Sequence, residues 1–400
     1  MKNSLYSMAV LLSIGLSACG GDNDHNTAVI PSVDAPKITP ILSQVRTTPI
    51  VVKGSDRQYH LVYELELRNI TPGNAVIEQV DVLDAEQEQV LASFSGQQVM
   101  DRLQVGGGGA RTSSLAAAQF GVMYLHLSFA SSDTVPFRLQ HRIRAALEIP
   151  APPEFAVSLG GVTNVQLEPV AALGAPLRGK GYIAADGCCE STRHIRALLP
   201  LNGGQWLAQR YAIDWEQVDE QNRLFVGDAA DVNSYHIYGD EVFAVADATV
   251  AFAIDGYPDQ IPGALPSGID VADADGNHII LSLGRGLYAL YAHLQPGSVA
   301  VATGDKVKRG QFIGRVGNSG NTSEPHLHLH VMDAPSGLVA NGVPYVFDTF
   351  QITGIDLAGT EDFDNAALTG VPVAITPIDP PTQHTNELPM DLTVVDWLNE

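Results

Sequence analysis

The sequence has few cysteines, few basic residues and few amphipathic helical patterns. Its 400 residues contain 3 cysteines, and 22 lysines and arginines stand against 45 aspartates and glutamates, for a formal net charge of −23. Three cysteines are too few for a disulfide-rich scaffold. The deficit of positive charge argues against a nucleic-acid partner, because phosphate binding needs a cationic surface. The scarcity of amphipathic helices favours an all-β fold.

The start of the chain has the pattern of a secretory lipoprotein signal over residues 1–19. A basic residue precedes a short apolar run at 8–16, and no other stretch is apolar enough to span a membrane. The sequence "LSAC" resembles a bacterial lipobox, which implies cleavage before Cys19 and acylation of its thiol; an ordinary signal peptide with a chance cysteine is the alternative. Gly20 resembles the residue found in lipoproteins sorted to the outer membrane. We therefore expect a lipid-anchored protein of the bacterial cell envelope that faces the periplasm, with residues 20–40 as a flexible tether.

Residues 41–150 predict an antiparallel β-sandwich. The segments "HLVYELELR", "MYLHLSFA" and "FRLQHRIR" alternate apolar with polar side chains, as strands with one buried face do, and Pro/Gly turns separate them. This domain shows no catalytic constellation and is expected to be a spacer or packing domain. "IPAPPE" at 149–154 predicts a linker to a second strand-rich domain.

A stripe of histidines marks the second domain. In "EPHLHLHVMD", His326, His328 and His330 alternate with leucines, which predicts a strand with three imidazoles on one face. His293 ends another predicted strand in "YALYAHLQPGS". The glycine-rich stretch "GDKVKRGQFIGRVGNSGN" lies between them.

These segments together resemble one known family. The run from "VFAVADATV" through "GNHIILSL", "YALYAHL" and "GDKVKRGQFIG" to "GNSGNTSEPHLH" is similar to the core of lysostaphin-type (LytM-type) zinc endopeptidases, which cut peptide cross-links of peptidoglycan. The resemblance implies a LytM-type antiparallel β-sheet peptidase domain at residues 155–350, with peptidoglycan peptides as substrate. It implies His328 as a ligand of Zn²⁺, with His293 and His326 as proton carrier and oxyanion stabiliser. His330 is not a ligand in the family pattern and is expected to support or pack.

The sequence departs from the family at another ligand motif. The family's His-x-Gly-x-Asp corresponds to "RYAID", in which Asp214 matches but Arg210 and Ala212 replace the histidine and the glycine. A guanidinium stays protonated and cannot bind Zn²⁺, whereas a catalytic Zn²⁺ usually has three protein ligands. A hairpin with residues 202–204 as its loop would set His194 opposite Ala212 and beside Asp214, so we expect His194 to be the replacement ligand. A slip of one residue in register would turn it to the other face.

Two functions follow from this pattern. The first is a zinc-dependent endopeptidase that hydrolyses peptidoglycan cross-links with His293 and His326 as catalytic residues. The alternative is a degenerate domain that binds peptidoglycan or regulates another cell-wall hydrolase without cutting. The complete histidine set favours the first function, and Arg210 favours the second. A purely structural lipoprotein would leave the histidine stripe unexplained.

The sequence also allows predictions for the cysteine pair, the C-terminal segment and the remaining histidines. Cys188 and Cys189 are expected as two buried thiols, because neighbouring α-carbons lie about 3.8 Å apart across a trans peptide bond, below the usual disulfide range of about 4.4–6.8 Å. Residues 351–400 are acidic and proline-rich and predict a C-terminal tail. Structural roles are expected for His60, His126, His141, His236, His278 and His384.

Overall fold

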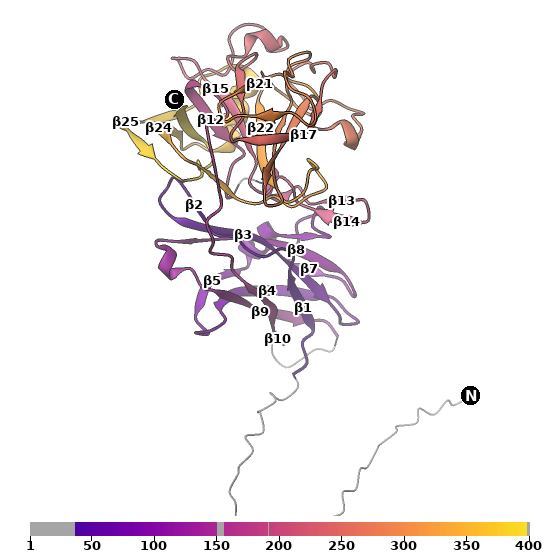
Figure 1. The fold of residues 1–400 in the computed structure, drawn as a ribbon. Coiled ribbons are helices and arrows are strands. Elements are labelled where there is room, and N and C mark those ends of the chain that lie inside the picture. The colour runs from indigo at the N-terminus through magenta and orange to yellow at the C-terminus, as the bar shows by residue number, and fades with distance from the viewer. Residues whose placement is uncertain (1–36, 150–155, 191, 398–400) are drawn as a thin grey trace, which may run out of the picture. The chain divides into compact units, whose positions relative to one another are not determined.

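The structure, a computed structural model, describes residues 37–149, 156–190 and 192–397 (Figure 1). The described residues from Thr39 onward form one compact unit. The described part is nearly all β, as the sequence predicted. None of its helices is long and apolar enough to cross a membrane. Cys19 and the predicted signal lie outside the described residues, as does most of the tether at 20–40.

The first part of the unit is an antiparallel β-sandwich, whose strands run from indigo to magenta in Figure 1. One sheet contains β1 (Ile41–Val45), β2 (Val52–Lys53), β3 (Tyr59–Asn69), β8 (Phe120–Phe129) and β6 (Leu103–Val105). The other contains β10 (Ala156–Asn164), β9 (Arg138–Leu147), β4 (Ala75–Asp84), β5 (Val90–Ser95) and β7 (Ser114–Leu115), and the short helix α1 (Gln97–Arg102) follows β5.

The alternation seen in the sequence explains the sandwich core. Leu61, Tyr63 and Leu65 of β3 are buried with Met123 of β8 and Val80 of β4. Burial of one face per sheet is what holds two stacked sheets together. The domain is longer than predicted, because β10 pairs with β9 beyond the expected boundary at residue 150.

The second part is built on one large antiparallel sheet. Among the described residues this sheet has 10 strands in the order β20, β17, β18, β19, β22, β15, β12, β26, β24, β25. Their bounds are Lys306–Val307, Ala248–Ile254, His278–Gly284, Leu287–Ala292, Leu327–Met332, Ile213–Gln217, Gly179–Ala185, Thr393–Trp397, Phe350–Asp356 and Ile375–His384. Three small two-stranded sheets accompany it: β11 (Ala171–Leu173) with β23 (Tyr345–Phe347), β13 (Leu199–Leu201) with β14 (Gly204–Trp206), and β16 (Glu241–Phe243) with β21 (Phe312–Arg315).

The histidine stripe lies on an inner strand of this sheet. β22 pairs with β19 on one side and β15 on the other. Leu327 and Leu329 point into the main core, so the pleat places His328 and His330 on the opposite face. The predicted strand and its alternation are confirmed, and the leucines anchor the face that carries the imidazoles.

The C-terminal segment is part of the sheet, which corrects the expectation of a tail at 351–400. β24 and β26 lie inside the sheet, and α2 (Thr360–Thr369) connects β24 to β25. Three of the segment's five prolines, Pro377, Pro380 and Pro381, lie on β25, which is the edge strand. An edge strand tolerates proline because one row of its backbone groups needs no sheet partner.

The cysteine pair also differs from the expectation of two free thiols. Cys188 and Cys189 form a disulfide. The expectation assumed a trans peptide bond, but the bond between these residues is cis, and their α-carbons are 3.0 Å apart.

A buried histidine of the sandwich predicts a pH-dependent stability. His141 contacts the Tyr63 hydroxyl at 2.9 Å and donates to the Gly161 carbonyl at 3.0 Å. Burial lowers the pKa of His141 from 6.5 to about 4. Between these pH values His141 therefore binds a proton in the unfolded chain but not in the folded chain. The free energy of unfolding should therefore fall as the pH drops from 6.5 to about 4, by roughly 3 kcal/mol from this group.

Urea unfolding across this pH window checks the prediction. His141→Gln should show a smaller loss of stability on acidification than the native chain, because its side chain does not titrate. His236→Gln, at a more exposed histidine, serves as the control. An equal acid dependence in His141→Gln and the native chain would show that His141 is not responsible.

Candidate metal centre

Asp214 and His328 meet because their strands are paired. β15 and β22 place the two residues directly opposite each other, with both side chains on one face of the sheet. His328 Nδ1 lies 2.7 Å from Asp214 Oδ1. Its other nitrogen, Nε2, lies 2.9 Å from His330 Nδ1. Two potential metal ligands are therefore fixed by the backbone register of the sheet.

His194 reaches the same carboxylate from outside the sheet. His194 Nε2 lies 3.3 Å from Asp214 Oδ2, and its ring centroid lies 5.0 Å from that of His328. The predicted route was wrong. The hairpin turn is Asn202-Gly203, with Leu201 opposite Gly204, and His194 begins a 3-10 turn before this hairpin. The structure thus brings His194 to Asp214 through a turn that the cross-strand argument did not foresee.

His293 and His326 lie beside His328 on the other side. Their ring centroids are 4.8 Å apart, and that of His293 is 5.8 Å from His328. His326 Nε2 is 3.5 Å from Asp214 Oδ1. His293 follows β19 with a φ of 61°, a left-handed conformation that is uncommon for a histidine. Gly317 packs closely against the chain that follows His293, because a Cβ at residue 317 would lie 2.3 Å from the backbone nitrogen of Gln295.

Backbone carbonyls orient three of the imidazoles. Nδ1 of His194 donates to the carbonyl of Asp186 at 3.0 Å. Nδ1 of His293 donates to that of Ser319 at 2.8 Å, and Nδ1 of His326 donates to that of Glu324 at 2.8 Å. A carbonyl oxygen only accepts, so each Nδ1 carries the hydrogen and each neutral ring keeps its lone pair on Nε2.

The electrostatics centre on the Asp214 carboxylate. Burial acts to raise the pKa of Asp214, but His194, His326 and His328 lower it well below the usual value. Burial acts to lower the pKa of His194, but Asp214 raises it to about 9. Burial lowers the pKa of His293 well below its ordinary range. The centre is therefore anionic at Asp214 and attracts positive charge.

The donor set fits a metal ion. His194, Asp214 and His328 each offer one ligand atom, and these atoms lie within 4.8 Å of one another. The His194 lone pair and the Asp214 oxygens are acceptors. The His328 Nδ1 is an acceptor too if its Nε2 donates to His330. Two imidazoles and a carboxylate match the ligands of a catalytic Zn²⁺. His293, His326 and His328 form a second overlapping group of this kind.

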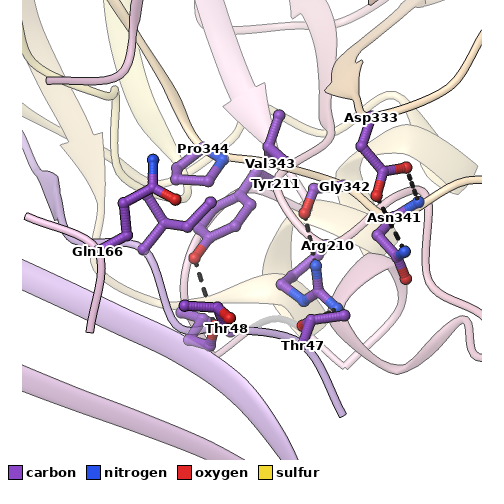
Figure 2. A pocket seen from close by; sticks show the side chains of 12 residues that line it. Thr47, Thr48, Gln166, Arg210, Tyr211, Asp333, Asn341, Gly342, Val343 and Pro344 are labelled. Atoms are coloured by element: carbon purple, nitrogen blue, oxygen red, sulfur yellow. Dashed lines mark hydrogen bonds between the residues drawn. The ribbon is translucent and has the colours of Figure 1, made fainter. Parts of the chain in front are cut away.

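Arg210 does not point at this centre. Its guanidinium makes a bidentate ion pair with Glu64 of β3, at 2.8 Å and 2.7 Å, and it also donates to the Gly342 carbonyl and the Thr47 hydroxyl. Arg210 is 4% exposed and Glu64 is 1% exposed. Figure 2 shows Arg210 in a pocket with Thr47, Tyr211 and Gly342. The charge of the Arg210 guanidinium is thus compensated by Glu64, away from the ligand cluster at Asp214.

His330 lies next to His328 on the side away from Asp214. It is fully buried, and its Nδ1 contacts His328 while its Nε2 has no hydrogen-bond partner among the described residues. A supporting role for His330 stays a prediction. Sequence reasoning missed Glu64 and the three backbone carbonyls, since a partner 146 residues away and a main-chain oxygen leave no local pattern.

The fold and site together define a chain with a buried histidine–aspartate centre on an antiparallel sheet. Residues 231–341 match the sequence model described as "Peptidase family M23". The chain therefore carries an M23 peptidase domain, which confirms the resemblance inferred from the sequence and supports a peptidase. The match includes His293, His326 and His328, whereas His194 and Asp214 precede it.

Individual relatives cover short segments. The peptidoglycan DD-endopeptidase ShyA of Vibrio cholerae is 39% identical over 57 residues, which are 14% of this chain and 13% of ShyA. The DD-carboxypeptidase/endopeptidase Mpg of Neisseria meningitidis is 32% identical over 110 residues, 26% of this chain and 24% of Mpg. The chain thus spans under a quarter of either relative. The catalytic domain of lysostaphin from Staphylococcus simulans is 23% identical, covering 41% of this chain and 88% of that domain, with a TM-score of 0.23.

The Arg210–Glu64 pair predicts the outcome of restoring the family histidine. Arg210→His should lower the free energy of unfolding by about 3–5 kcal/mol, because it leaves the Glu64 carboxylate buried without its partner. It should not raise the amount of Zn²⁺ bound, because residue 210 faces Glu64. Thermal unfolding and metal content by mass spectrometry measure the two effects.

A double variant is the matched control for this pair. Arg210→Met with Glu64→Met removes both charges and should be far more stable than Arg210→Met alone. A gain of Zn²⁺ in Arg210→His, or unchanged stability, would contradict the assignment of Arg210 to Glu64.

Proposed function

We propose that the protein is a zinc-dependent endopeptidase that hydrolyses peptide cross-links of peptidoglycan in the bacterial cell envelope. The observation that carries this proposal is the convergence of His194, Asp214 and His328 ligand atoms at one largely buried point. The M23 domain and the printed activities of ShyA and Mpg support it. The regulatory alternative rested on Arg210, whose charge is taken up by Glu64.

His194, Asp214 and His328 would hold the Zn²⁺. When bound, the ion supplies Lewis-acid chemistry that activates water for attack on an amide. The neutral Nε2 of His293 and of His326 is free to accept a proton, since each Nδ1 is committed to a backbone carbonyl. One of these rings can accept the proton of the attacking water while the protonated form of the other hydrogen-bonds the developing oxyanion.

The cellular setting is part of the proposal. The lipobox-like sequence before Cys19 and the acidic composition support a lipoprotein whose peptidase domain acts in the periplasm. The lipid on Cys19 would tie the enzyme to the outer membrane. Mass spectrometry of the mature N-terminal peptide tests this, because an unmodified Cys19 would exclude the anchor.

The ligand assignment predicts matched losses of metal. His194→Ala and His328→Ala should each remove most of the bound Zn²⁺, because either change leaves only two of the three protein ligands. Metal content is measured by mass spectrometry on folded, equally purified variants. His236→Ala, whose histidine belongs to no ligand cluster among the described residues, is the control. Full Zn²⁺ retention in His194→Ala would exclude His194 as a ligand.

The proton-transfer roles predict a different signature. His293→Ala and His326→Ala should retain Zn²⁺ but lose about 10²–10⁴-fold in the rate of cross-link cleavage, because they remove proton transfer and leave the ligands. Release of cleaved peptides from purified peptidoglycan is the assay, with His278→Ala as the control. Joint loss of metal and activity in both variants would instead make these histidines ligands or folding residues.

A further inference from the structure

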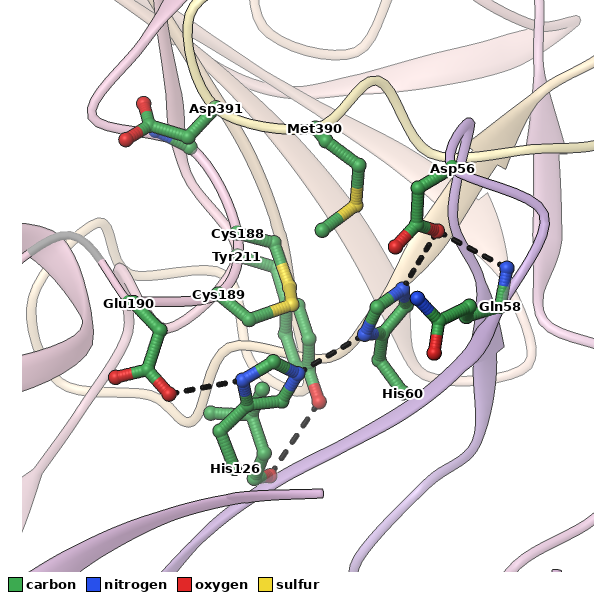
Figure 3. The surroundings of a disulfide bond; sticks show 12 residues. Asp56, Gln58, His60, His126, Cys188, Cys189, Glu190, Tyr211, Met390 and Asp391 are labelled. Atoms are coloured by element: carbon green, nitrogen blue, oxygen red, sulfur yellow. Dashed lines mark hydrogen bonds and ion pairs between the residues drawn. A yellow bond between two sulfur atoms is a disulfide. The ribbon is translucent and has the colours of Figure 1, made fainter. Parts of the chain in front are cut away.

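A second group of metal-type ligands shares no residue with the centre at Asp214. His60 of β3, His126 of β8 and Cys189 each offer one ligand atom, and these atoms lie within 4.8 Å of one another (Figure 3). Val62 faces His126 across the two strands, so His60 and His126 are diagonal neighbours on one face of the sandwich sheet. Cys189 comes from the loop that follows β12. The sequence had predicted structural roles for both histidines.

Each histidine is anchored by a carboxylate. His60 Nε2 lies 3.0 Å from Asp56 Oδ1, and His126 Nδ1 lies 3.0 Å from Glu190 Oε1. An ionised carboxylate only accepts hydrogen bonds, so His60 Nε2 and His126 Nδ1 carry the hydrogens.

The remaining two nitrogens then face each other as acceptors. His60 Nδ1 lies 2.9 Å from His126 Nε2. Two lone pairs at this distance repel unless a cation lies between them, and that cation is either a proton or a metal ion. Imidazoles backed by carboxylates are the usual surroundings of metal-ligating histidines.

Cys189 can provide a third ligand only when its sulfur is a free thiol. We propose that His60, His126 and Cys189 form a second Zn²⁺ site, which becomes available when the Cys188–Cys189 disulfide is reduced by a dithiol. Two imidazoles and a thiolate are ligands that Zn²⁺ prefers. In the disulfide form, Cys189 Sγ is bonded to Cys188 and cannot act as a thiolate.

Disulfide reduction and metal binding are two separate steps. The dithiol gives two electrons and two protons, so the S–S bond breaks, both cysteines become thiols and the dithiol becomes a disulfide. On binding Zn²⁺, Cys189 releases its thiol proton to solvent, and any proton held between the two imidazoles is also released to solvent.

The site lies close in sequence to the first centre. Asp186, three residues before Cys189, is the residue whose carbonyl accepts from His194. The same loop therefore orients a ligand of the proposed catalytic metal and supplies a ligand of the second one. A metal at the second site would fasten this loop to the sandwich.

Two single-cysteine variants test the site without a reductant. Cys188→Ser breaks the disulfide and leaves Cys189 as a free thiol, whereas Cys189→Ser breaks it and removes the ligand. Cys188→Ser should bind one more Zn²⁺ per chain than the oxidised native protein, and Cys189→Ser should show no gain. The native protein should gain the same ion after treatment with a small dithiol and anaerobic desalting. Metal content by mass spectrometry gives the stoichiometry.

Cobalt substitution separates this site from the first centre. Thiolate bound to Co²⁺ absorbs in the near ultraviolet, and the ligands proposed at Asp214 include no sulfur. Cys188→Ser loaded with Co²⁺ should show this band, also when combined with His328→Ala, and should lose it when combined with His126→Gln. Failure of the proposed catalytic site would thus leave this result unchanged.

Circular dichroism and thermal unfolding establish that each variant is folded. The proposal is overturned if folded Cys188→Ser gains no Zn²⁺ and shows no thiolate–cobalt band. It is also overturned if Cys189→Ser gains Zn²⁺ to the same extent.

Discussion

The pairing of β15 with β22 is the constraint on which the candidate metal centre depends. It sets the Asp214 carboxylate against His328 in a largely buried position, and His194 and His326 direct further nitrogens at the same carboxylate. A buried carboxylate is costly without compensating positive charge. Asp214 raises the pKa of His194 to about 9, so without a metal ion a proton on His194 supplies part of this charge, and a bound cation would take its place.

A second buried charge is compensated separately. Arg210 precedes Asp214 by four residues, but the chain turns between them, and the guanidinium binds Glu64 of the sandwich. Arg210, which stands where the resemblance led us to expect a histidine ligand, is thus a contact between the sandwich and the large sheet. This explains how an arginine can occupy that position while the cation-binding geometry at Asp214 is preserved.

The sandwich contributes more than packing surface. Its strand β3 carries both Glu64, which pairs with Arg210, and His60, which faces His126 and Cys189. Both histidines are anchored on their outer nitrogens, as His194, His293 and His326 are anchored on Nδ1. In each case a fixed acceptor decides which nitrogen remains available, and so where a cation can bind.

The sequence by itself determined the all-β class, the alternating strands of the sandwich and the strand that carries His328 and His330 directly after His326, because side-chain periodicity is a local property of the chain. It also identified the M23-like core, whose motifs are short and contiguous. Only the tertiary structure decided the rest. The route of His194 to Asp214, the pairing of Arg210 with Glu64 and the place of residues 351–397 in the sheet depend on contacts between distant segments. Strand pairing and turn geometry fix such contacts, and neither leaves a periodic signal in the residues themselves.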